Sequence, residues 1–421
     1  MKDSRHDTAE IIRSFLGEGL PRYLSILREM VGINSHTQNP TGVDRLGDYT
    51  ADLFRDMGFT AERIPSVNPR YGRHLLLHRP GTSKRAVACV SHLDTVFSPE
   101  EEERHDFRWR VEGDRAYGPG TVDIKGGTLV MLMMLEALKE EAPAVFDAVS
   151  WELLFDASEE TESDDFGALC AKRLALSGDD GALACLVFEA GTARGSGQNL
   201  VTSRKGRAEF RFRVEGRGGH SGVAHRRGAS AIRQMAELIT RLEKMTDYGA
   251  GLTVNVGTVS GGTEINRVPH HAEARVEMRA FDPGVFERAA DDIMAMDGLS
   301  TVRSADGEFS CRTHVDLVRR VPAWPENPGT MGLFDQWHRA ARLLGGEARP
   351  EMRGGLSDGN FTWSVVPTID GLGPSGGNPH CSESDPDAGK EQEYAVISSF
   401  VPKAVLNAMA LIALIEDKGL L

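Results

Sequence analysis

Positive charge is scarce in this chain of 421 residues. The 48 Lys and Arg residues are outnumbered by 62 Asp and Glu residues, so the formal net charge at pH 7 is −14. A protein that binds nucleic acid needs a basic surface to neutralise phosphates, and docking on an anionic membrane surface needs one as well. The composition therefore argues against nucleic acid and against a membrane as partners.

Cysteine is rare as well. The chain has five cysteines, scattered and without a C-x-x-C pair: Cys89, Cys170, Cys185, Cys311 and Cys381. An odd and dispersed set predicts free thiols in a reducing compartment rather than a disulfide framework. The first 20 residues contain no basic segment followed by a continuous apolar one, so we predict no secretory signal. We expect a cytoplasmic protein.

Long hydrophobic runs are missing too. The richest, Leu129–Leu135, is far shorter than the roughly 20 residues that a membrane-spanning helix needs. The sequence shows no internal repeat and no low-complexity tract. At about 150 residues per domain, the chain has room for two or three domains. Such a chain can bury several cores without disulfide bonds.

Apolar, β-branched runs alternate with helical patterns over the first 200 residues. The predicted strands are 74–77, 86–91, 149–155 and 183–188. The predicted helices include 8–31, 43–57 and 127–140. Strands that alternate with helices predict an α/β fold, with a mostly parallel sheet flanked by helices on both faces.

The pattern changes near Ser203. From 206 to 214, apolar and charged residues alternate, which predicts a strand with one face in water. The elements that follow complete the order strand, helix, strand, strand, helix, strand, an α+β (βαββαβ) unit of its own. The α/β pattern then resumes. We therefore predict a domain inserted at 204–318 between two parts of one catalytic domain, 1–203 and 319–421.

Ionisable residues gather where three of the predicted strands end. His92 and Asp94 follow the second strand, Glu159 and Glu160 follow the third, and Glu189 follows the fourth. In open α/β sheets, ligands bind beyond the carboxyl ends of the strands. The sequence therefore predicts a functional site at this edge of the sheet.

Two glycine-rich loops add further candidates. Asp123 lies in the segment 118–127, directly before a strongly apolar helix, and His380 ends the segment 370–380. Glycine-dense loops allow the backbone to approach another group closely. The first loop lacks the G-x-x-x-x-G-K-[ST] spacing of a phosphate-binding loop, so it does not favour a nucleotide site.

Five of these residues form a set of nitrogen and oxygen donors without a thiolate: His92, Asp123, Glu160, Glu189 and His380. Such donors suit Zn²⁺, with Co²⁺ or Mn²⁺ as substitutes. Five protein ligands exceed what one open catalytic zinc ion uses, so the set suits two ions that share a bridging carboxylate. In the pair Glu159–Glu160, one side chain can bind metal while the other faces a water molecule as general base.

Eight stretches resemble the motifs of one known family, in the same order and over most of the chain. They are SHLDTVF (91–97), YGPGTVDIKGG (117–127), ASEETES (157–163), VFEAG (187–191), GRGGHSG (216–222), GGTEINRVPHHAEARVEMR (261–279), GLSDGN (355–360) and GLGPSGGNPHCSE (371–383). The family is that of the two-zinc exopeptidases and deacylases. It includes bacterial glutamate carboxypeptidase, acetylornithine deacetylase, succinyl-diaminopimelate desuccinylase, aminoacylase and cytosolic dipeptidases. The segments 117–127 and 371–383 look most like the glutamate carboxypeptidase branch.

The resemblance implies a role for each metal-ligand candidate. Asp123 would be the carboxylate that bridges two zinc ions. Glu160 and His380 would complete one zinc site, and His92 and Glu189 the other. A hydroxide bridging the two ions would attack the amide carbonyl.

The resemblance also implies which residues assist the reaction. Glu159 would be the general base and acid, and Asp94 would orient His92. The inserted domain resembles the family's lid and dimerisation domain, which implies a homodimer. His220 resembles the histidine that stabilises the oxyanion, in its own or the partner subunit's active site.

Two further positions on the lid resemble substrate contacts, namely Asn266 and Arg279. The chain departs from the family pattern at Ser230, where Asn is common, and at His270–His271, which replace an acidic residue. These departures affect substrate contacts and leave the metal ligands unchanged.

The resemblance predicts a metal-dependent hydrolase that cleaves an amide bond next to a free carboxylate. A carboxypeptidase-type metallopeptidase acting on a small peptide or an N-acyl amino acid fits best. The alternative is an N-acyl-amino-acid deacylase of the acetylornithine or succinyl-diaminopimelate type, or a dipeptidase. A metal-free homologue that only binds a ligand is a hypothesis from another class, and the complete ligand set argues against it.

Overall fold

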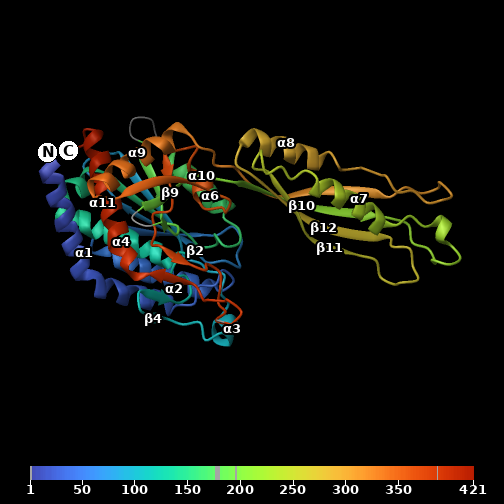
Figure 1. Ribbon diagram of the computed structural model, residues 1–421, viewed down its shortest axis with the longest axis horizontal. Coiled ribbons are helices and arrows are strands. Elements are labelled where there is room, and N and C mark those ends of the chain that lie inside the picture. Colours follow the sequence, from blue (N-terminus) through green and yellow to red (C-terminus); the bar gives the residue numbers. More distant parts are fainter. Residues whose placement is uncertain (1, 176–180, 195–196, 386) are drawn as a thin grey trace. The chain divides into compact units, whose positions relative to one another are not determined.

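The computed structural model describes residues 2–175, 181–194, 197–385 and 387–421 (Figure 1). Its contacts divide the chain into two units. The first unit comprises 1–202, 326–352 and 357–421, and the second comprises 203–325 and 353–356. The predicted return to the catalytic domain at residue 319 falls inside strand β13 (Arg312–Val321), which pairs with β10 (Gly206–Glu215) of the second unit.

A mixed six-stranded sheet forms the centre of the first unit, in the order β1-β2-β6-β3-β7-β15. The strands in this order are Thr60–Pro65, Arg73–Arg79, Ser150–Asp156, Ala86–His92, Ala182–Val187 and Thr368–Ile369. The four from β6 to β15 are parallel, whereas β1 and β2 add an antiparallel edge. The prediction of a mostly parallel sheet is therefore confirmed.

Both faces of this sheet are covered, since alternate residues of one strand pack into two different clusters of buried side chains. Val87 and Cys89 of β3 belong to one cluster of buried side chains, and Ala88 and Val90 belong to another. The first cluster is covered by α1, α2, α4, α9 and α11 (Figure 1). These helices span Lys2–Val31, Pro40–Arg55, Lys125–Glu141, Pro328–Leu343 and Phe400–Asp417. The second cluster contains residues of α6 (Asp164–Leu174).

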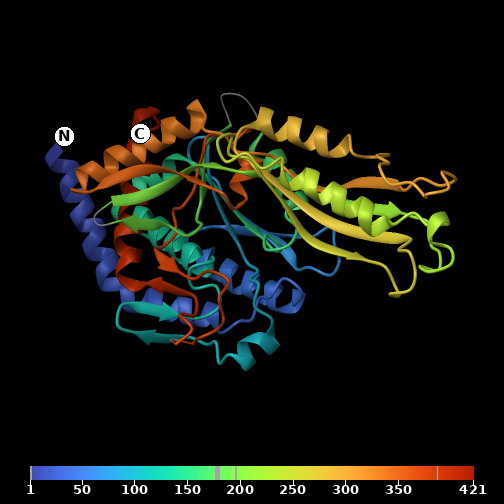
Figure 2. The same ribbon diagram turned by 45° about the vertical axis from the view of Figure 1, so that its right-hand side comes forward.

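Short helices and two small sheets complete the first unit. The short helices are α3 (Pro99–Arg104), α5 (Pro143–Ala148) and α10 (Gly359–Thr362). One small sheet has the order β14-β9-β8, with strands Glu347–Arg353, Gly197–Arg204 and Thr192–Arg194. The other has the order β16-β17-β5-β4, with strands Gly376–Gly377, Tyr394–Val396, Arg115–Tyr117 and Arg110–Glu112. This second sheet places the C-terminal β16 and β17 beside β5, far away in sequence (Figure 2).

One helix is apolar over a longer stretch than any run seen in the sequence. By length and composition alone, the segment Ile397–Asp417 is long and apolar enough to cross a membrane. Two thirds (67%) of its most apolar window is buried inside the protein. Leu406, Ala410 and Leu411 of α11 are fully or almost fully buried in the core, as expected of a central helix in a folded domain.

The second unit has a four-stranded antiparallel sheet in the order β11-β12-β10-β13. Besides β10 and β13, its elements are β11 (Thr253–Gly261), β12 (His271–Ala280), α7 (Ala231–Glu243) and α8 (Pro283–Met294). Helices α7 and α8 run along this sheet (Figure 2). Ala208, Phe210, Phe212 and Val214 of β10 are buried in a cluster with residues of both helices, and the residues between them are less buried. The predicted βαββαβ order is confirmed.

Candidate metal centre

The predicted ligands of the first unit lie at the carboxyl ends of the parallel strands. His92 is the last residue of β3, and it is in register with Asp156, the last residue of β6. Glu159 and Glu160 follow β6 within a few residues, and Glu189 follows β7. Because β3, β6 and β7 are parallel neighbours, their ends meet at one edge of the sheet.

Asp123 lies at the centre of the group, with a histidine on each carboxylate oxygen. His92 Nε2 lies 3.2 Å from Asp123 Oδ1, and His380 Nε2 lies 3.2 Å from Asp123 Oδ2. His380 Nε2 also lies 3.1 Å from Glu160 Oε2, and His92 Nε2 lies 3.8 Å from Glu189 Oε1. The structure thus brings together all five residues that the sequence analysis proposed as ligands.

This arrangement fits a pair of divalent cations. One ligand atom each from His92, Asp123 and Glu160 lie within 4.8 Å of one another. Each histidine turns Nε2 toward a different oxygen of one carboxylate, as a bridging carboxylate requires. Nitrogen and carboxylate donors without thiolate suit Zn²⁺ and its neighbours among the transition metals.

The acid groups of the site are costly to hold together without a counter-charge. Burial and the neighbouring Asp123 raise the pKa of Glu160. The two carboxylates in turn raise the pKa of His380 to about 11. For His92, burial lowers the pKa, but hydrogen bonds to Asp123 and Asp94 raise it well above its ordinary value. The group therefore favours positive charge next to its carboxylates, which a bound cation provides.

Asp94 orients both His92 and the Glu159–Glu160 pair. His92 Nδ1 lies 3.0 Å from the Asp94 main-chain oxygen and 3.4 Å from its Oδ1, which leaves Nε2 directed at Asp123. The main-chain N–H of Glu159 donates to Asp94 Oδ1 at 3.1 Å, and that of Glu160 donates to Oδ2 at 3.2 Å. The Thr37 hydroxyl donates to Oδ2 at 2.6 Å. A second contact on the far nitrogen of a metal-binding histidine fixes the ring and its tautomer.

Glu159 has the electrostatic setting of a proton-transfer group. Burial raises its pKa well above the ordinary value, the nearby His92 opposes this effect, and the carboxylates of Glu189 and Glu160 add to it. A carboxylic group whose pKa is raised toward neutrality serves as an effective base and acid at neutral pH.

The sequence analysis did not single out several buried ionisable residues near this centre. Asp358 is 3% exposed, and burial together with Asp156 and Glu159 raises its pKa well above the ordinary value. Glu393 is fully buried, and its Oε1 accepts hydrogen bonds from the main chain at Val122 and Asp123. For Asp358 the available signal was an acid inside a glycine-rich segment, which alone does not identify a partner, and Glu393 follows the charged segment 390–392 without any such signal.

A buried histidine, His74, contacts the last residue of β6. His74 Nδ1 lies 3.1 Å from Asp156 Oδ1, and His74 Nε2 lies 3.2 Å from Asp165 Oδ2. Burial lowers the pKa of His74, but the two aspartates raise it to about 9. This ion network holds the segment that leads into Glu159 and Glu160.

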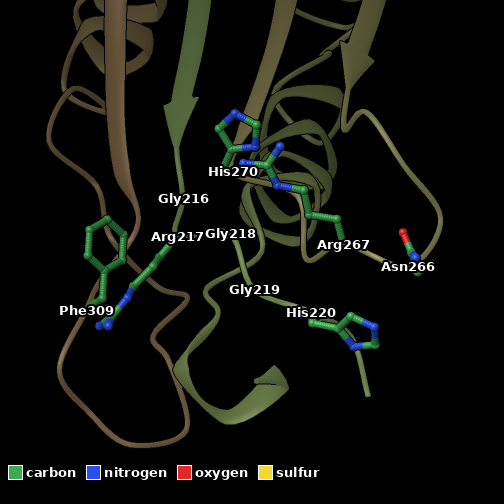
Figure 3. Close-up of a pocket in the computed structure, with 9 residues that line it drawn as sticks. All are labelled: Gly216, Arg217, Gly218, Gly219, His220, Asn266, Arg267, His270 and Phe309. Carbon is green, nitrogen blue, oxygen red and sulfur yellow. The ribbon is translucent and has the colours of Figure 1, made fainter. Parts of the chain in front are cut away.

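Two of the candidates in the second unit share a pocket of about 660 Å³ (Figure 3). Figure 3 shows His220 and Asn266 at its rim, with Arg267 reaching toward His270. The pocket is lined by Gly216, Arg217, Gly218, Gly219, His220, Asn266, Arg267, His270 and Phe309. None of these described lining residues is acidic. His270, where the sequence departs from the family pattern, thus lies in this pocket. Its Nδ1 is buried without a hydrogen-bond partner in the described structure.

Arg279, the third candidate of the second unit, is not among the residues that line this pocket. Its Nε and Nη2 donate to the two carboxylate oxygens of Glu277 at 2.8 and 3.1 Å. Its Nη1 donates to the Gly354 main-chain oxygen at 3.0 Å. Arg279 therefore holds the segment 353–356 on its own unit.

Comparisons of the whole chain with known proteins agree in the class of protein they find. A family model described as a peptidase dimerisation domain (M20_dimer) matches residues 202–296. Carboxypeptidase G2 of a Pseudomonas species is 26% identical over 394 residues, which cover 93% of this chain and 89% of that protein. Acetylornithine deacetylase of Erwinia tasmaniensis is 26% identical over 292 residues, which cover 65% and 72%.

Solved structures share the fold at lower identity. Aminopeptidase PepT of Bacillus cereus is 19% identical with a TM-score of 0.73, over 94% of this chain and 98% of that chain. The dipeptidase Dug1p of Saccharomyces cerevisiae is 15% identical with a TM-score of 0.66, over 97% and 98%.

Proposed function

We propose that this chain, which is similar to carboxypeptidase and acetylornithine deacetylase relatives and matches an M20 peptidase dimerisation domain, is a hydrolase of amide bonds, namely a carboxypeptidase-type enzyme with two zinc ions per subunit. Its substrate would be a small peptide or an N-acyl amino acid, cleaved next to a free carboxylate. The observation that carries the proposal is the position of Asp123, whose two oxygens face the Nε2 atoms of His92 and His380.

Each proposed ion has its own set of donors. One ion would be held by His92, Asp123 and Glu189, and the other by His380, Asp123 and Glu160. When bound, divalent cations supply Lewis acidity, which acidifies water and polarises an amide carbonyl. Glu159 is not a proposed ligand of either ion, so its carboxylate is available for proton transfer.

Glu159 would move the proton of the reaction. In our proposal its carboxylate accepts a proton from the attacking water and then donates that proton to the leaving amine. Asp94 keeps the segment in place, because its carboxylate accepts from the N–H groups of Glu159 and Glu160. His220 would donate a hydrogen bond to the developing oxyanion.

The free carboxylate of the substrate needs a cationic partner. Arg279 resembles a substrate-contacting position of the lid, but its guanidinium donates to Glu277 and to the Gly354 main-chain oxygen. We therefore propose Arg267, which lines the pocket of the second unit together with His220 and Asn266. A guanidinium binds a carboxylate through two parallel hydrogen bonds.

A deacylase of N-acyl amino acids is the second candidate, because one relative is named acetylornithine deacetylase. The two activities use the same chemistry and differ in the acyl group and the leaving amine. A hydrolysis panel separates them. Zinc-loaded protein is assayed with acyl-glutamates, dipeptides and N-acetyl amino acids, with and without a chelator.

We expect acyl-glutamates or dipeptides with a free α-carboxylate to be cleaved fastest, with activity lost on chelation. Preferred cleavage of N-acetyl amino acids would favour the deacylase. If zinc-loaded protein cleaves no amide in the panel, the proposed function is wrong.

We also propose that the enzyme is a cytoplasmic homodimer that pairs through its second unit. The match of 202–296 to a dimerisation domain supports the pairing, and the five free cysteines are consistent with a reducing compartment. Light scattering coupled to size-exclusion chromatography tests the dimer. A mass near 46 kDa per particle, that of a single 45.9 kDa chain, would contradict it.

A further inference from the structure

We infer that Glu393 is a positioning residue for the metal centre, because it joins the loop of Asp123 to the loop of His380. The inference rests on the function proposed above, since it assigns Glu393 a role in holding two proposed ligands at their mutual distance. In sequence, Glu393 lies 13 residues after His380 and 270 residues after Asp123.

The side chain of Glu393 holds the Asp123 loop. Its Oε1 accepts a hydrogen bond from the Val122 N–H at 3.0 Å and another from the Asp123 N–H at 3.2 Å. Two consecutive N–H groups therefore converge on one oxygen, which fixes the backbone from which the Asp123 carboxylate projects.

The main chain of Glu393 holds the His380 loop. Its N–H donates to the Cys381 main-chain oxygen at 2.8 Å, and Cys381 directly follows His380. Its carbonyl accepts from the Gly118 N–H at 3.4 Å, at the start of the Asp123 loop. One residue thus makes hydrogen bonds to both loops, and the carboxylate of Asp123 and the ring of His380 meet between them at 3.2 Å.

The surroundings of Glu393 keep it from moving. The next residue, Tyr394, pairs with Tyr117 of β5 and with Gly377 of β16. A Cβ added at Gly376 would lie 2.2 Å from the Tyr394 oxygen and 2.6 Å from Val122 Cγ2, so these segments are packed as closely as glycine allows. A shift of Glu393 therefore has to disturb this small sheet.

A carboxylate at this position is unexpected for packing alone. The side chain is fully buried, and its Oε2 has no hydrogen-bond partner among the described residues. Burying such a group costs free energy unless its hydrogen bonds and neighbouring charges compensate. Here burial and the neighbouring Asp123 raise the pKa of Glu393 to about 8, and the two N–H donors act in the opposite direction. The residue is expensive to place, and its contacts lead to two metal ligands.

Three variants separate positioning from simple packing. Glu393→Gln keeps an oxygen that can accept both N–H groups, so its metal affinity should stay within a few-fold of wild type. Glu393→Leu loses the acceptor, and Glu393→Asp is one methylene too short to keep both contacts. Contacts behind a metal ligand are typically worth about 10- to 100-fold in metal affinity, and we expect a loss of this size in both variants.

The matched control is Glu112→Gln. Glu112 lies in β4 of the same small sheet, is exposed, and forms an ion pair with Arg110 on its own strand. The control removes a carboxylate from this sheet, and its ion-pair partner lies outside both loops, so metal affinity should stay unchanged.

The experiment measures zinc binding to metal-free protein by competition with a chromophoric chelator, without any substrate. Hydrogen exchange of the peptide covering 118–124 is followed in parallel. We expect faster exchange at Val122 and Asp123 in Glu393→Leu and Glu393→Asp, with α4 still protected as proof of folding. Should Glu393→Leu fail to fold, Glu393→Asp carries the test.

The outcomes also separate this inference from the proposed function. Wild-type zinc affinity in Glu393→Asp or Glu393→Leu, with the 118–124 peptide exchanging faster, would overturn the role of Glu393 alone. An equal loss of affinity in Glu393→Gln would overturn it as well, since hydrogen-bond geometry would then not be the cause. Wild-type protein that binds no zinc would contradict the proposed metal centre itself.

Discussion

The two units of this chain place opposite charges at their candidate sites. In the first unit, carboxylates are concentrated and largely buried: the side chains of Asp94 and Glu160 are 0% and 7% exposed. In the second unit, the pocket is lined by Arg217, Arg267 and two histidines, without an acid among its described residues. The first site is suited to cations and the second to an anion.

The net charge of −14 does not reveal this difference in local charge between the two sites. A summed charge describes the far field of a protein, whereas binding depends on the charges within a few ångströms. The excess of acid includes carboxylates that repel one another until cations arrive. In the second unit, the pocket lined by Arg217 and Arg267 has no acid among its described lining residues, which suits an anionic substrate.

Removal of metal should produce the largest difference between the two units. We expect chelation to abolish hydrolysis and to lower the melting temperature, because like charges at Asp123, Glu159 and Glu160 then lose their counter-charge. At a free zinc concentration 100 times the Kd, binding stabilises by about 2.7 kcal/mol. Calorimetry and hydrogen exchange, with and without zinc, measure the effect.

The second unit serves as the internal control in that experiment. Its core lies around α7 and α8 and contains no proposed ligand, so exchange in β10 and β12 should not change. If removal of metal speeds up hydrogen exchange equally in both units, then metal stabilises the second unit as much as the first, and the expected difference between the units is wrong.

Replacing the proposed base should be the next largest effect. Glu159→Gln removes proton transfer and keeps the other donors, so kcat should fall about 10²- to 10⁴-fold while metal content is unchanged. Steady-state kinetics and metal analysis of the same preparation measure both quantities. Glu162→Gln, at an exposed carboxylate three residues later, is the control. Near-wild-type turnover in metal-loaded Glu159→Gln would rule out this role.

The anionic subsite of the second unit can be tested without touching the metals. Arg267→Gln should raise KM about 10- to 100-fold for substrates with a free carboxylate, because hydrogen bonds to charged groups contribute about 1.5–3 kcal/mol. Metal content and kcat should change little. Initial rates on a substrate and on its amidated form measure the effect.

Arg226→Gln is the matched control for Arg267, since Arg226 is an exposed neighbour outside the pocket lining. If Arg267→Gln raises KM equally for the amidated substrate, the guanidinium does not recognise the carboxylate.

The smallest predicted effect concerns the helix that covers the sheet of the second unit. The Ser230 hydroxyl accepts from the Arg233 N–H at 3.2 Å and so caps α7. Ser230→Ala should cost about 1 kcal/mol of stability, and Ser230→Asn should retain the cap. Thermal unfolding measures both variants. A change in zinc affinity in either one would mean that the two units are coupled more closely than their separate cores suggest.

Much of the fold follows from residue periodicity. The apolar run 86–91 and the alternation in 206–214 predicted two kinds of strand, one buried on both faces and one wet on one face, because side chains alternate across a strand. The difference at residue 319 has an equally local cause: Arg319–Val321 still pairs with β10, and nothing in its composition marks the end of a domain.

The candidate site was predictable where each residue follows an element that the sequence reveals. His92 and Glu189 directly follow strong strand patterns, and Asp123 precedes an apolar helix. Glu393 and His74 gave no such signal, because their importance comes from partners far away in sequence. For Arg279, the sequence predicted a substrate contact, and only the structure shows that its guanidinium donates to Glu277 and Gly354.

The sequence by itself indicated the resemblance to the two-zinc exopeptidases and deacylases, the α/β fold with its inserted α+β unit, and the types of donor at the strand ends. These depend on the order and period of residues, which a chain carries before it folds. Only the tertiary structure decided that His92 and His380 face different oxygens of Asp123, that Glu393 joins their loops, and that Arg279 is occupied. Distances of about 3 Å between residues hundreds of positions apart are set by packing, and no local pattern encodes them.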